Sequence, residues 1–571
     1  MSFSIKNQGS FSEIKKDLSV YLSKILDFKE SEIFKLLEKP LNKSHGHLSL
    51  PVFTFSKLKK QNPKDLSQEM VLQIQKHPLP FLEKTEALSG FVNFKFTPSY
   101  IKSLLEKTMS QKELASFKNP QKEHWIIDFA SPNVAKYMNV GHLRATVIGQ
   151  AIVNLTLQMG YKVTSLNHLG DWGSQFGKLL WAYKKWGQEY KFKKQPFETL
   201  VQLYVRFHKE AEQDPQKLKE ATDLFQKLEA GDSSLKKLWK TFVKLSLKNY
   251  DQYWKILNTK HDLVLGESFY RKFTKDLAYR LNHENLLEKS EGAEVVFLED
   301  MPPCIIVKSD GASTYAARDL CSAIYRFEKL KADRNIYITG TDQNLHFKQI
   351  FKTLEKINPS WSQNCLHLSF GMYRFKGEGK MSTRKGQSIY LKDVIEQSIE
   401  RVKKIIEERR PELKNKNKIA EQVGIGAIVF NDLISDRIKD VDFDWNKVLD
   451  FEGSSGPFIQ YTHVRCLSLL KKVPKIKKKK FSENFPQGEE IHLMWLLLQF
   501  EEAILQSFQH FKPHILARYL LDLSKEFNRF YASERILDSK NQEDLLLLVD
   551  TVRRTLNQGL RLLNIPAPSA M

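Results

Sequence analysis

The spacing of apolar residues along the 571-residue chain changes between regions, and each spacing predicts a different kind of element. Residues 1 to about 118 alternate helical stretches such as FSEIKKDLSVYLSKIL with a strand-like segment, GFVNFKFT at 90–97. A proline-containing linker, SFKNPQKEH, leads into a strand, a helix and a strand: EHWIIDF, VIGQAIVNLTLQMG and YKVTSLNHLG. This βαβ order predicts parallel strands joined by a right-handed crossover.

Residues 180 to about 293 are helical and strongly charged, with no clear strand before HDLVLGESFY. Strand patterns return with CIIVKSD at 304–310 and NIYITGTDQN at 335–344. We therefore expect one α/β sheet that a helical insertion divides in two. Beyond about residue 395 the pattern is helical to the end, and the lysine run at 471–481 is typical of a solvated loop. The expected domains are residues 1–118, 119–395 and 396–571.

Composition narrows the class of protein. The length predicts two to four domains, and 41% hydrophobic with 27% charged residues suits a soluble protein with sizeable cores. No apolar run reaches the roughly 18 residues that a membrane-spanning helix needs, and the N-terminus lacks a signal-peptide core. The four cysteines show no Cys-x-x-Cys spacing, which argues against a disulfide framework and a structural zinc site. We expect a cytoplasmic protein with no membrane partner.

The charge balance adds a candidate partner. Lys and Arg total 89 against 67 acidic residues, a formal net charge of +22. A basic excess of this size suggests a polyanionic partner, most often nucleic acid. A generally basic proteome would give the same excess, so composition alone leaves both explanations open.

A strand-turn-helix junction, ASPNVAKYMNVGHLRAT at 130–146, carries the first candidate chemistry. A helix N-terminus offers unpaired N–H groups and partial positive charge, so it binds phosphate well. Gly141 would let a ligand approach the backbone, and His142 could donate a hydrogen bond to a phosphoryl oxygen. Lys136 and Arg144 add positive charge. A tight helix entry capped by the histidine is the alternative interpretation of Gly-His alone.

This junction resembles the His-x-Gly-His motif of class I aminoacyl-tRNA synthetases. The flanking SPNVAK and LR narrow the resemblance to the arginyl-tRNA synthetases, whose pattern is Ser-Pro-Asn, an aliphatic residue and Ala-Lys. The chain departs from the family at Asn139, where the family normally has histidine. Asparagine still donates a hydrogen bond to phosphate but never carries a charge, and hydrogen bonds to charged groups contribute about 1.5–3 kcal/mol. The departure bears on catalytic efficiency and not on the fold.

A second basic segment, GEGKMSTRKGQSIYLKDV at 377–394, follows the strands. Its glycines favour a mobile loop, its lysines and arginine supply charge to a triphosphate, and its hydroxyls donate hydrogen bonds. Alone it is typical of a basic turn, but paired with the first motif it resembles the Lys-Met-Ser-Lys-Ser loop of class I synthetases. The resemblance implies a catalytic set made of Asn139, Gly141, His142, Lys380, Met381, Ser382 and Lys385. The ATP-binding residues it implies are Lys136, Asn139, Gly141, His142, His346, Lys380 and Ser382.

An arginine substrate needs carboxylates for its guanidinium group. Tyr315 and Asp319 lie four residues apart and would share a helix face, although an ordinary amphipathic helix gives the same spacing. The resemblance assigns guanidinium recognition to this pair and to Glu267 in LGESFY, and it assigns the α-amino and carboxylate end to Asn133 and Gln343. The segment NHLGDWG also follows the family pattern, which would place Asn167, His168 and Asp171 near the carboxyl ends of the sheet.

The C-terminal helices carry candidate RNA contacts. Phe458 and Tyr461 lie near His463 and Arg465, and unstacked bases stack on aromatic rings of this kind. Core aromatics at a helix start are the alternative. The resemblance implies an anticodon-binding helical domain here, with Phe458, Tyr461, Arg465 and Tyr531 as contacts, and an N-terminal domain that touches the tRNA elbow.

The resemblance covers nearly the whole chain and implies its architecture and activity. It implies a Rossmann-type parallel-sheet catalytic domain split by a helical insertion, an α+β N-terminal domain and an all-α C-terminal anticodon-binding domain. The activity would be ATP-dependent ligation of L-arginine to tRNA(Arg) through an arginyl-adenylate, releasing AMP and pyrophosphate. ATP would enter as a substrate with Mg²⁺, no structural metal is expected, and we expect a monomer.

Two alternatives stay open. The first is a paralogue that binds tRNA but has lost activation, and Asn139 is the single feature that favours it. The second is another class I enzyme, such as a cysteinyl synthetase or a non-tRNA nucleotidyl transferase. The absence of a cysteine-histidine zinc set argues against the former and the long helical C-terminal half against the latter.

Overall fold

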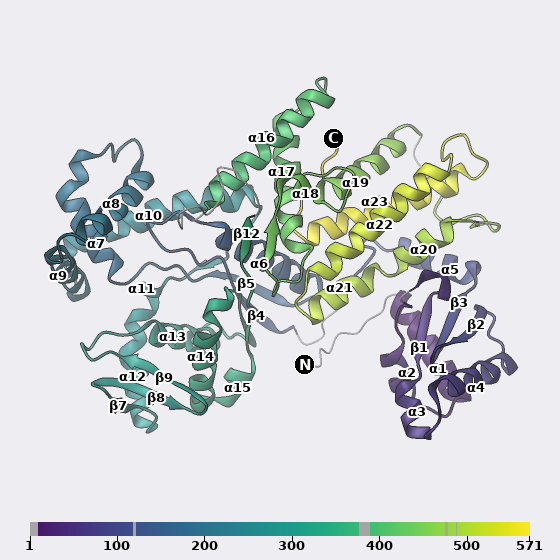
Figure 1. The fold of residues 1–571 in the computed structure, drawn as a ribbon, viewed down its shortest axis with the longest axis horizontal. Coiled ribbons are helices and arrows are strands. Elements are labelled where there is room, and N and C mark those ends of the chain that lie inside the picture. Colours follow the sequence, from purple (N-terminus) through teal and green to yellow (C-terminus); the bar gives the residue numbers. More distant parts are fainter. Residues whose placement is uncertain (1–9, 41, 118–121, 376–388, 474–477, 487) are drawn as a thin grey trace. The chain divides into compact units, whose positions relative to one another are not determined.

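The structure is a computed structural model that describes residues 10–40, 42–117, 122–375, 389–473, 478–486 and 488–571. Its contacts divide the chain into two units. Figure 1 shows the ribbon coloured by residue number along the chain. Unit 1 contains residues 1–120, 451–562 and 567–571, and unit 2 contains residues 121–450 and 563–566. The domain boundary expected at residue 395 falls inside a helix, α16 (Leu391–Arg409), whereas the contacts change near residue 450.

Unit 2 is built on a five-stranded sheet whose strand order is β11-β10-β4-β5-β6, with every pairing parallel. Its strands are β4 (His124–Asp128), β5 (Lys162–Asn167), β6 (Leu263–Val264), β10 (Arg334–Tyr337) and β11 (Cys365–His367). Because parallel strands are covered on both faces, central β4 is a continuous apolar run in the sequence. The order of strands reverses between β4 and β10, and open sheets of this kind bind ligands beyond the carboxyl ends at such a point. The expected Rossmann-type parallel sheet is confirmed.

The helix that follows β4, α6 (Val140–Gln158), is buried over most of its length. Gly149 faces the ring of Phe129, and a Cβ atom built on this glycine would lie 2.3 Å from Cγ of that ring. The absence of a side chain therefore sets how closely α6 approaches the chain leaving β4. A second buried helix, α17 (Lys416–Leu433), packs against α6 and α16.

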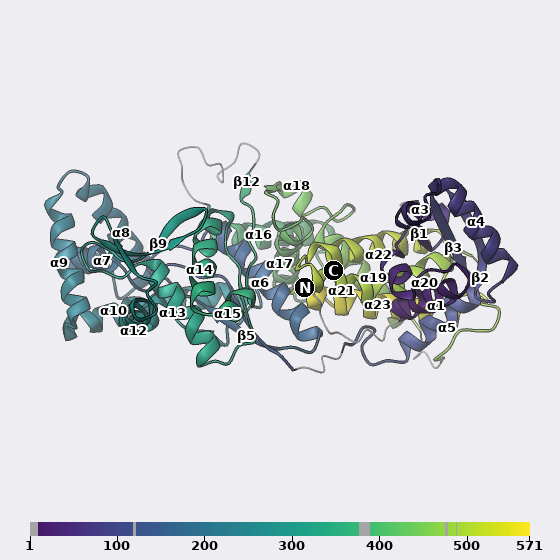
Figure 2. The same cartoon turned by 90° about the horizontal axis from the view of Figure 1, so that it is seen from below.

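The expected helical insertion is present, but it contains more than helices. Figure 2 shows the first four helices grouped together in unit 2. They are α7 (Gln175–Trp186), α8 (Pro196–Ala211), α9 (Gln216–Ala230) and α10 (Ser233–Ile256). After β6 come α11 (Glu267–Tyr270), α12 (Thr274–His283), β7 (Glu288–Ser290), β8 (Ala293–Leu298) and β9 (Met301–Val307).

The segment CIIVKSD was expected in the parallel sheet, and this prediction is wrong. It forms part of β9, in a separate antiparallel sheet of order β7-β8-β9. Cys304 and Ile306 are buried in the core, whereas Ile305 between them is 45% exposed. The strand is therefore buried on one face, as antiparallel strands commonly are, and its apolar run resembles a fully buried strand only in sequence.

The rest of unit 2 returns to the parallel sheet and then becomes mainly helical. Its elements are α13 (Tyr315–Glu328), α14 (Asn344–Ile357), α15 (Pro359–Gln363), β12 (Tyr373–Phe375), α16, α17, β13 (Val441–Phe443) and α18 (Trp445–Val448). The chain beyond residue 395 was expected to be helical throughout, and β13 is the exception. This three-residue strand pairs in parallel with β12, and it is too short for periodicity to reveal.

Unit 1 joins the two ends of the chain. An antiparallel sheet of order β1-β3-β2 is formed by β1 (Leu48–Pro51), β2 (Leu82–Leu88) and β3 (Phe91–Phe96). The N-terminal helices are α1 (Ser10–Ile25), α2 (Glu30–Leu36), α3 (Phe53–Lys59), α4 (Pro63–Lys76) and α5 (Pro98–Met109). The C-terminal helices are α19 (Gly456–Lys471), α20 (Glu490–Leu498), α21 (Phe500–Gln509), α22 (His514–Ser533) and α23 (Gln542–Leu562).

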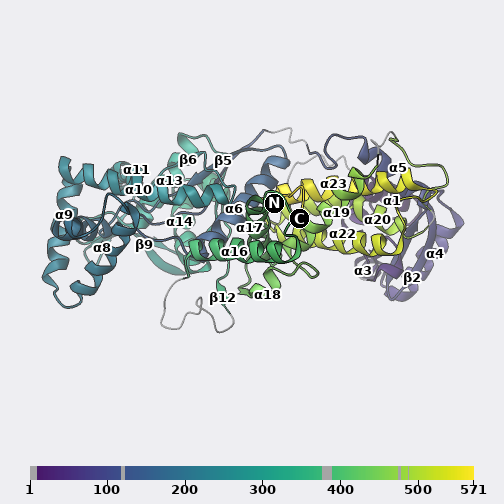
Figure 3. The same cartoon turned by 90° about the horizontal axis from the view of Figure 1, so that it is seen from above.

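Helices α19, α22 and α23 run side by side in unit 1 (Figure 3). The Gln558 side chain of α23 accepts a hydrogen bond from the backbone of Leu114 and donates one to the carbonyl of Ala115. His47, which precedes β1, packs on Trp495 of α20 at 4.7 Å between ring centroids. The α+β N-terminal segment and the C-terminal helices therefore fold as one body. Among the described residues, no helix is both long and apolar enough to cross a membrane.

Replacing Gly149 with alanine is expected to destabilise unit 2 by about 1–3 kcal/mol, because the new methyl group overlaps the Phe129 ring and overpacked cores pay that cost. Thermal unfolding followed by circular dichroism would measure the change. Leu157→Ala, at a position 51% exposed on the same helix, is the matched control and should change stability by less than about 0.5 kcal/mol. Equal stability of G149A and the unchanged chain would contradict this packing.

Candidate functional site

Asn139 is the N-cap of α6. Its Oδ1 accepts hydrogen bonds from the backbone N–H groups of Gly141, at 3.0 Å, and His142, at 3.3 Å. The N–H of Val140 donates to the carbonyl of Ile389 at 3.1 Å. The prediction that this helix N-terminus presents unpaired N–H groups to a phosphate is therefore wrong for these three residues. Asparagine is among the strongest N-cap residues, and that preference explains the arrangement.

His142 closes the same turn from the other side. Its Nδ1 lies 3.0 Å from the backbone nitrogen of Asn139 and 2.8 Å from Oδ1 of that residue. Both contacts keep Nδ1 inside the turn, so Nε2 is the ring nitrogen left for a ligand. Burial, together with the nearby charge of Lys136, lowers the pKa of His142 to about 4. The imidazole is consequently neutral at pH 7, which suits a hydrogen-bonding role better than a charged one.

Arg144 does not supply charge to a ligand, contrary to the expectation from the sequence. Its side chain is fully buried, and Nη1 donates to the carbonyl of Gly371 at 2.7 Å while Nε lies 3.5 Å from the Asp432 carboxylate of α17. The Tyr373 hydroxyl of β12 donates to the other oxygen of Asp432 at 2.6 Å. Arg144 therefore fastens α6 to β12 and α17.

The second basic motif adjoins this helix at both of its flanks. Gly371 precedes the segment and accepts the Arg144 hydrogen bond, and Tyr390, near the end of the segment, forms an isolated β-bridge with Asn139. Leu391, at the start of α16, donates to the carbonyl of Met138 at 2.8 Å. The expected residues Lys380, Met381, Ser382 and Lys385 lie outside the described residues.

Residues that follow β4 and β5 meet beyond the carboxyl end of the sheet. Asn133 forms an isolated parallel bridge with Gly170, and a Cβ on this glycine would lie 2.1 Å from Oδ1 of Asn133. Asn167, the last residue of β5, is fully buried, and its amide group has no hydrogen-bond partner within the described ranges. The expected placement of this segment near the carboxyl end of the sheet is confirmed.

The Asp319 carboxylate lies close to two histidines, His346 and His168. Its Oδ2 lies 2.6 Å from Nε2 of His346, and its Oδ1 lies 3.4 Å from Nε2 of His168. Burial works to raise the pKa of Asp319, but the hydrogen bond from His346 and the neighbouring positive charges outweigh it and leave the pKa lowered. The same contact raises the pKa of His346 against the effect of burial. Asp319 is therefore an ionised carboxylate at the end of the sheet.

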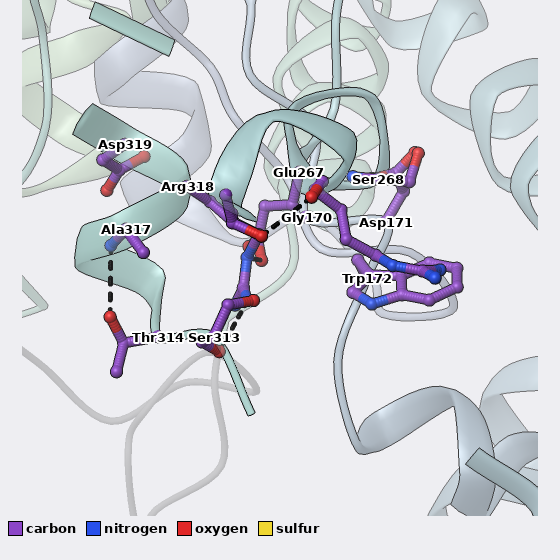
Figure 4. Close-up of polar contacts among 12 residues, drawn as sticks. Gly170, Asp171, Trp172, Glu267, Ser268, Ser313, Thr314, Ala317, Arg318 and Asp319 are labelled. Atoms are coloured by element: carbon purple, nitrogen blue, oxygen red, sulfur yellow. Dashed lines mark hydrogen bonds and ion pairs between the residues drawn. The ribbon is translucent and has the colours of Figure 1, made fainter. Parts of the chain in front are cut away.

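Glu267 is a buried carboxylate near Asp319, and its partner was not predicted from the sequence (Figure 4). The Nε atom of Arg318 donates to Oε2 of Glu267 at 2.8 Å, and the Arg318 guanidinium lies 4.8 Å from the centroid of the Tyr315 ring. Burial raises the pKa of Glu267, Arg318 opposes this and Asp319 reinforces it, and the result is a pKa of about 7. Tyr315 is 62% exposed at the start of α13.

The residues on either side of Glu267 fix its position. The backbone N–H and the hydroxyl of Ser268 donate to the Asp171 carboxylate at 2.8 and 2.6 Å (Figure 4). A Cβ on Gly266 would lie 2.4 Å from Oδ1 of Asp171, so glycine permits this approach. In the sequence LGESFY, Glu267 therefore stands between Gly266, which lets Asp171 approach closely, and Ser268, which donates hydrogen bonds to Asp171. Gln343 is exposed in the short turn (Thr341–Gln343) after β10, on the opposite side of the strand-order reversal from β4.

The candidate RNA contacts of unit 1 also come together. The Arg465 guanidinium lies between two tyrosine rings, 4.8 Å from the centroid of Tyr461 and 4.9 Å from that of Tyr531. Tyr461 is 39% and Tyr531 36% exposed, and Phe458 is half-buried one turn earlier on α19. His463 is buried instead, and burial lowers its pKa to about 4.

Three protein families match consecutive parts of the chain. The family described as "Arginyl tRNA synthetase N terminal domain" matches residues 12–96. The "tRNA synthetases class I (R), catalytic domain" matches residues 104–445, which is more than half of the chain, and the "DALR anticodon binding domain" matches residues 459–571.

Full-length relatives agree with these matches. An arginine–tRNA ligase of Clostridium acetobutylicum is 37% identical over 566 residues, covering 98% of this chain and 100% of the relative. One of Clostridioides difficile is 39% identical over 555 residues, covering 96% and 98%. Solved structures of arginyl-tRNA synthetases from Plasmodium falciparum and Thermus thermophilus superpose with TM-scores of 0.82 at 24% identity, covering 99% and 98% of this chain and 100% of each of those chains. At that identity the two structures support the fold.

Replacing Asn139 with alanine is expected to lower the stability of unit 2 by about 0.5–2 kcal/mol, because the N–H groups of Gly141 and His142 lose their acceptor. Asn139→Asp is the matched control, since it keeps a cap oxygen and places negative charge at a helix N-terminus. Thermal unfolding of both variants would test this. If the aspartate variant lost as much stability as the alanine variant, Asn139 would not act as a cap.

Proposed function

The chain belongs to the arginyl-tRNA synthetase family, and from this premise we propose that it activates L-arginine with ATP and transfers the arginyl group to tRNA(Arg). It is an enzyme of the arginine–tRNA ligase class with a class I catalytic domain, and it charges tRNA with arginine. The proposed steps are formation of arginyl-adenylate with release of pyrophosphate, followed by transfer to the 3′ end of the tRNA with release of AMP.

Two carboxylates, the buried Glu267 and the partly buried Asp319, carry the proposal. Asp319 and Glu267 both lie beyond the carboxyl end of the sheet, and Asp319 is close enough to raise the pKa of Glu267. A planar guanidinium carries several N–H donors and can meet acceptors on both carboxylates at once. We assign Glu267, Tyr315 and Asp319 to the guanidinium end of arginine, and Asn133 and Gln343 to its α-amino and carboxylate end.

We assign ATP to the groups around the first turn of α6. Neutral His142 would donate a hydrogen bond from Nε2, Gly141 keeps the turn open, and Lys136 is an exposed cation nearby. Asn139 would contribute through its amide nitrogen, because its oxygen caps the helix. His346, which contacts Asp319, is also assigned to the ATP side. The assigned loop residues Lys380, Met381, Ser382 and Lys385 lie outside the described residues.

No covalent enzyme intermediate is needed for this chemistry. The arginine carboxylate would attack the α-phosphate of ATP, and the enzyme would contribute alignment and stabilisation of the charge that develops on pyrophosphate. Mg²⁺ would arrive with the ATP phosphates as part of that substrate. Within the described residues no group of three or more histidine, cysteine or acidic side chains is arranged to hold a metal ion.

We assign tRNA to unit 1. The Tyr461–Arg465–Tyr531 cluster offers exposed rings on which anticodon bases would stack, with Phe458 at its edge. The N-terminal domain would touch the tRNA elbow, and the net charge of +22 favours a polyanion. We further propose that the enzyme acts in the cytoplasm as a monomer. A tRNA-binding paralogue without activation remains the second candidate, because Asn139 replaces the histidine that is usual in the family.

Arginine-dependent ATP–pyrophosphate exchange, measured with and without tRNA(Arg), tests the proposal first. We expect exchange that depends on both arginine and tRNA, as the family resemblance implies. Isotope exchange into ATP is the measurement, and lysine in place of arginine is the control for specificity. No exchange under either condition, while the tRNA still binds, would instead support the inactive paralogue.

Asp319→Ala should raise the KM for arginine at least about thirtyfold, because truncating one member of a buried charge pair costs about 2 kcal/mol or more. Aminoacylation at saturating ATP and tRNA measures the change. Glu328→Ala, which removes an exposed carboxylate from the last turn of the same helix, is the control and should leave the KM unchanged. Near-normal arginine use by D319A would remove Asp319 from the proposed pocket.

A further inference from the structure

We propose that Arg318 is a positioning residue of the arginine site, which holds one oxygen of Glu267 and balances one of the two pocket carboxylates. The other Glu267 oxygen and Asp319 then meet the single guanidinium group of the substrate. This inference rests on the proposed function, because it assigns Arg318 to the pocket that takes arginine. Arg318 does not touch the reacting atoms in this assignment.

Arg318 contacts only one of the two carboxylate oxygens of Glu267. Its Nε donates to Oε2 of Glu267 at 2.8 Å, and its Nη1 donates to the carbonyl and hydroxyl oxygens of Ser313 at 3.1 and 3.3 Å (Figure 4). The structure shows no hydrogen bond to Oε1 of Glu267 from the residues it describes. Arg318 is 5% exposed and Glu267 8% exposed, so water competes little for this contact.

Arg318 is itself held by the turn that begins α13. Ser313 forms an isolated β-bridge with Val307 at the end of β9. The Thr314 hydroxyl accepts from the N–H of Ala317 at 3.1 Å and donates to the carbonyl of Ile305 at 2.6 Å. The carbonyl that receives Arg318 is therefore fixed to β9 by backbone pairing and a helix cap. The guanidinium carbon also lies over the Tyr315 ring, 4.8 Å from its centroid.

The charges of the proposed arginine pocket require a second cation such as Arg318. Glu267 and Asp319 would bring two negative charges to a substrate side chain that carries one positive charge. A buried carboxylate without a partner takes up a proton instead of staying charged. Arg318 supplies the missing positive charge, so one substrate guanidinium completes the balance. Asp171 is directed to Ser268, and His168 and His346 are directed to Asp319, so these neighbours do not replace Arg318 at Glu267.

The sign of the pH dependence follows from these groups. The ionised form of Glu267 binds the cation, so arginine affinity should fall as the pH drops through about 7, the pKa of Glu267. Arg318 lowers that pKa, whereas Asp319 and Asp171 raise it. Removing the Arg318 charge should therefore move the midpoint upward, by about one pH unit or more. Asp319, Asp171, His168 and His346 are present in both proteins, so the comparison isolates the effect of Arg318.

The test is L-arginine binding to the full chain by isothermal titration calorimetry across pH, with Arg318→Gln beside the unchanged chain. At pH 7 we expect R318Q to bind arginine about tenfold to a hundredfold more weakly, and the midpoint of its pH profile to lie higher. R318Q should also discriminate less between arginine and citrulline, the uncharged isostere, because a protonated Glu267 donates to the citrulline carbonyl. Arg280→Gln, which removes a surface cation that pairs with Glu328 of the same helix, is the matched control.

Two further variants separate positioning from general damage. Glu267→Gln removes the titrating group, so R318Q in that background should show no shift of the midpoint. Arg318→Lys keeps the charge and loses the planar contacts, so it should weaken binding at every pH while its midpoint stays near that of the unchanged chain. If R318Q does not fold, R318K decides the question, and a midpoint displaced upward in R318K would overturn the charge-balancing role.

The outcomes also separate this inference from the proposed function. Arginine binding and its pH profile unchanged in R318Q would overturn the inference and leave the proposed function in place. A uniform loss of affinity without a midpoint shift would likewise overturn it. Arginine binding with the expected shift, but without any aminoacylation, would support Arg318 and overturn the proposed function. A chain that binds no arginine would overturn both.

Discussion

Unit 2 depends on burying guanidinium groups without leaving their charge unmatched. Taking one such ion out of water costs several kcal/mol, which is offset only where carboxylate and carbonyl oxygens surround it. Arg144 meets this requirement with Asp432 and the carbonyl of Gly371, and Arg326 meets it with Asp128 at 2.6 Å. Each contact joins elements far apart in the sequence. The carboxyl end of the sheet is held in place by these matched charges as well as by apolar packing.

The sequence predicts elements where burial has a simple period. The apolar run WII of β4 and the long buried helix α6 were recognisable because a parallel strand and a core helix are apolar on every side. Strand β9 has a similar run, CII, but is buried on one face, and composition cannot distinguish the two cases. The short strand β13 contributes too few residues for any periodicity. Whether such a segment forms a strand depends on the strand it pairs with. A partner that is distant in the sequence leaves no sign in the local pattern of apolar residues.

The site residues likewise divide into those with a local sequence signal and those whose partners are distant in the sequence. Asn167 was expected near the carboxyl ends of the parallel strands, and it is the last residue of β5, because parallel strands end on the same side of a sheet. Arg318 was missed although it stands beside Asp319 in the sequence, because its partner Glu267 is 51 residues away and lone arginines are common on helices. The one available signal was a cation next to a predicted binding acid. Arg144 was misassigned because a charged residue after a glycine-histidine pair is expected to face a ligand.

The contacts of Asn139 give this residue a structural role that the sequence did not predict. A histidine at this position would bring a possible charge, whereas asparagine brings an oxygen that caps α6 and leaves an amide nitrogen for a ligand. The same turn keeps His142 neutral and its Nε2 available. The substitution therefore exchanges one function for another instead of simply removing a group. This weakens the case for an inactive paralogue, because an asparagine that still caps the first turn preserves the geometry on which the proposed stabilisation of the leaving phosphates depends.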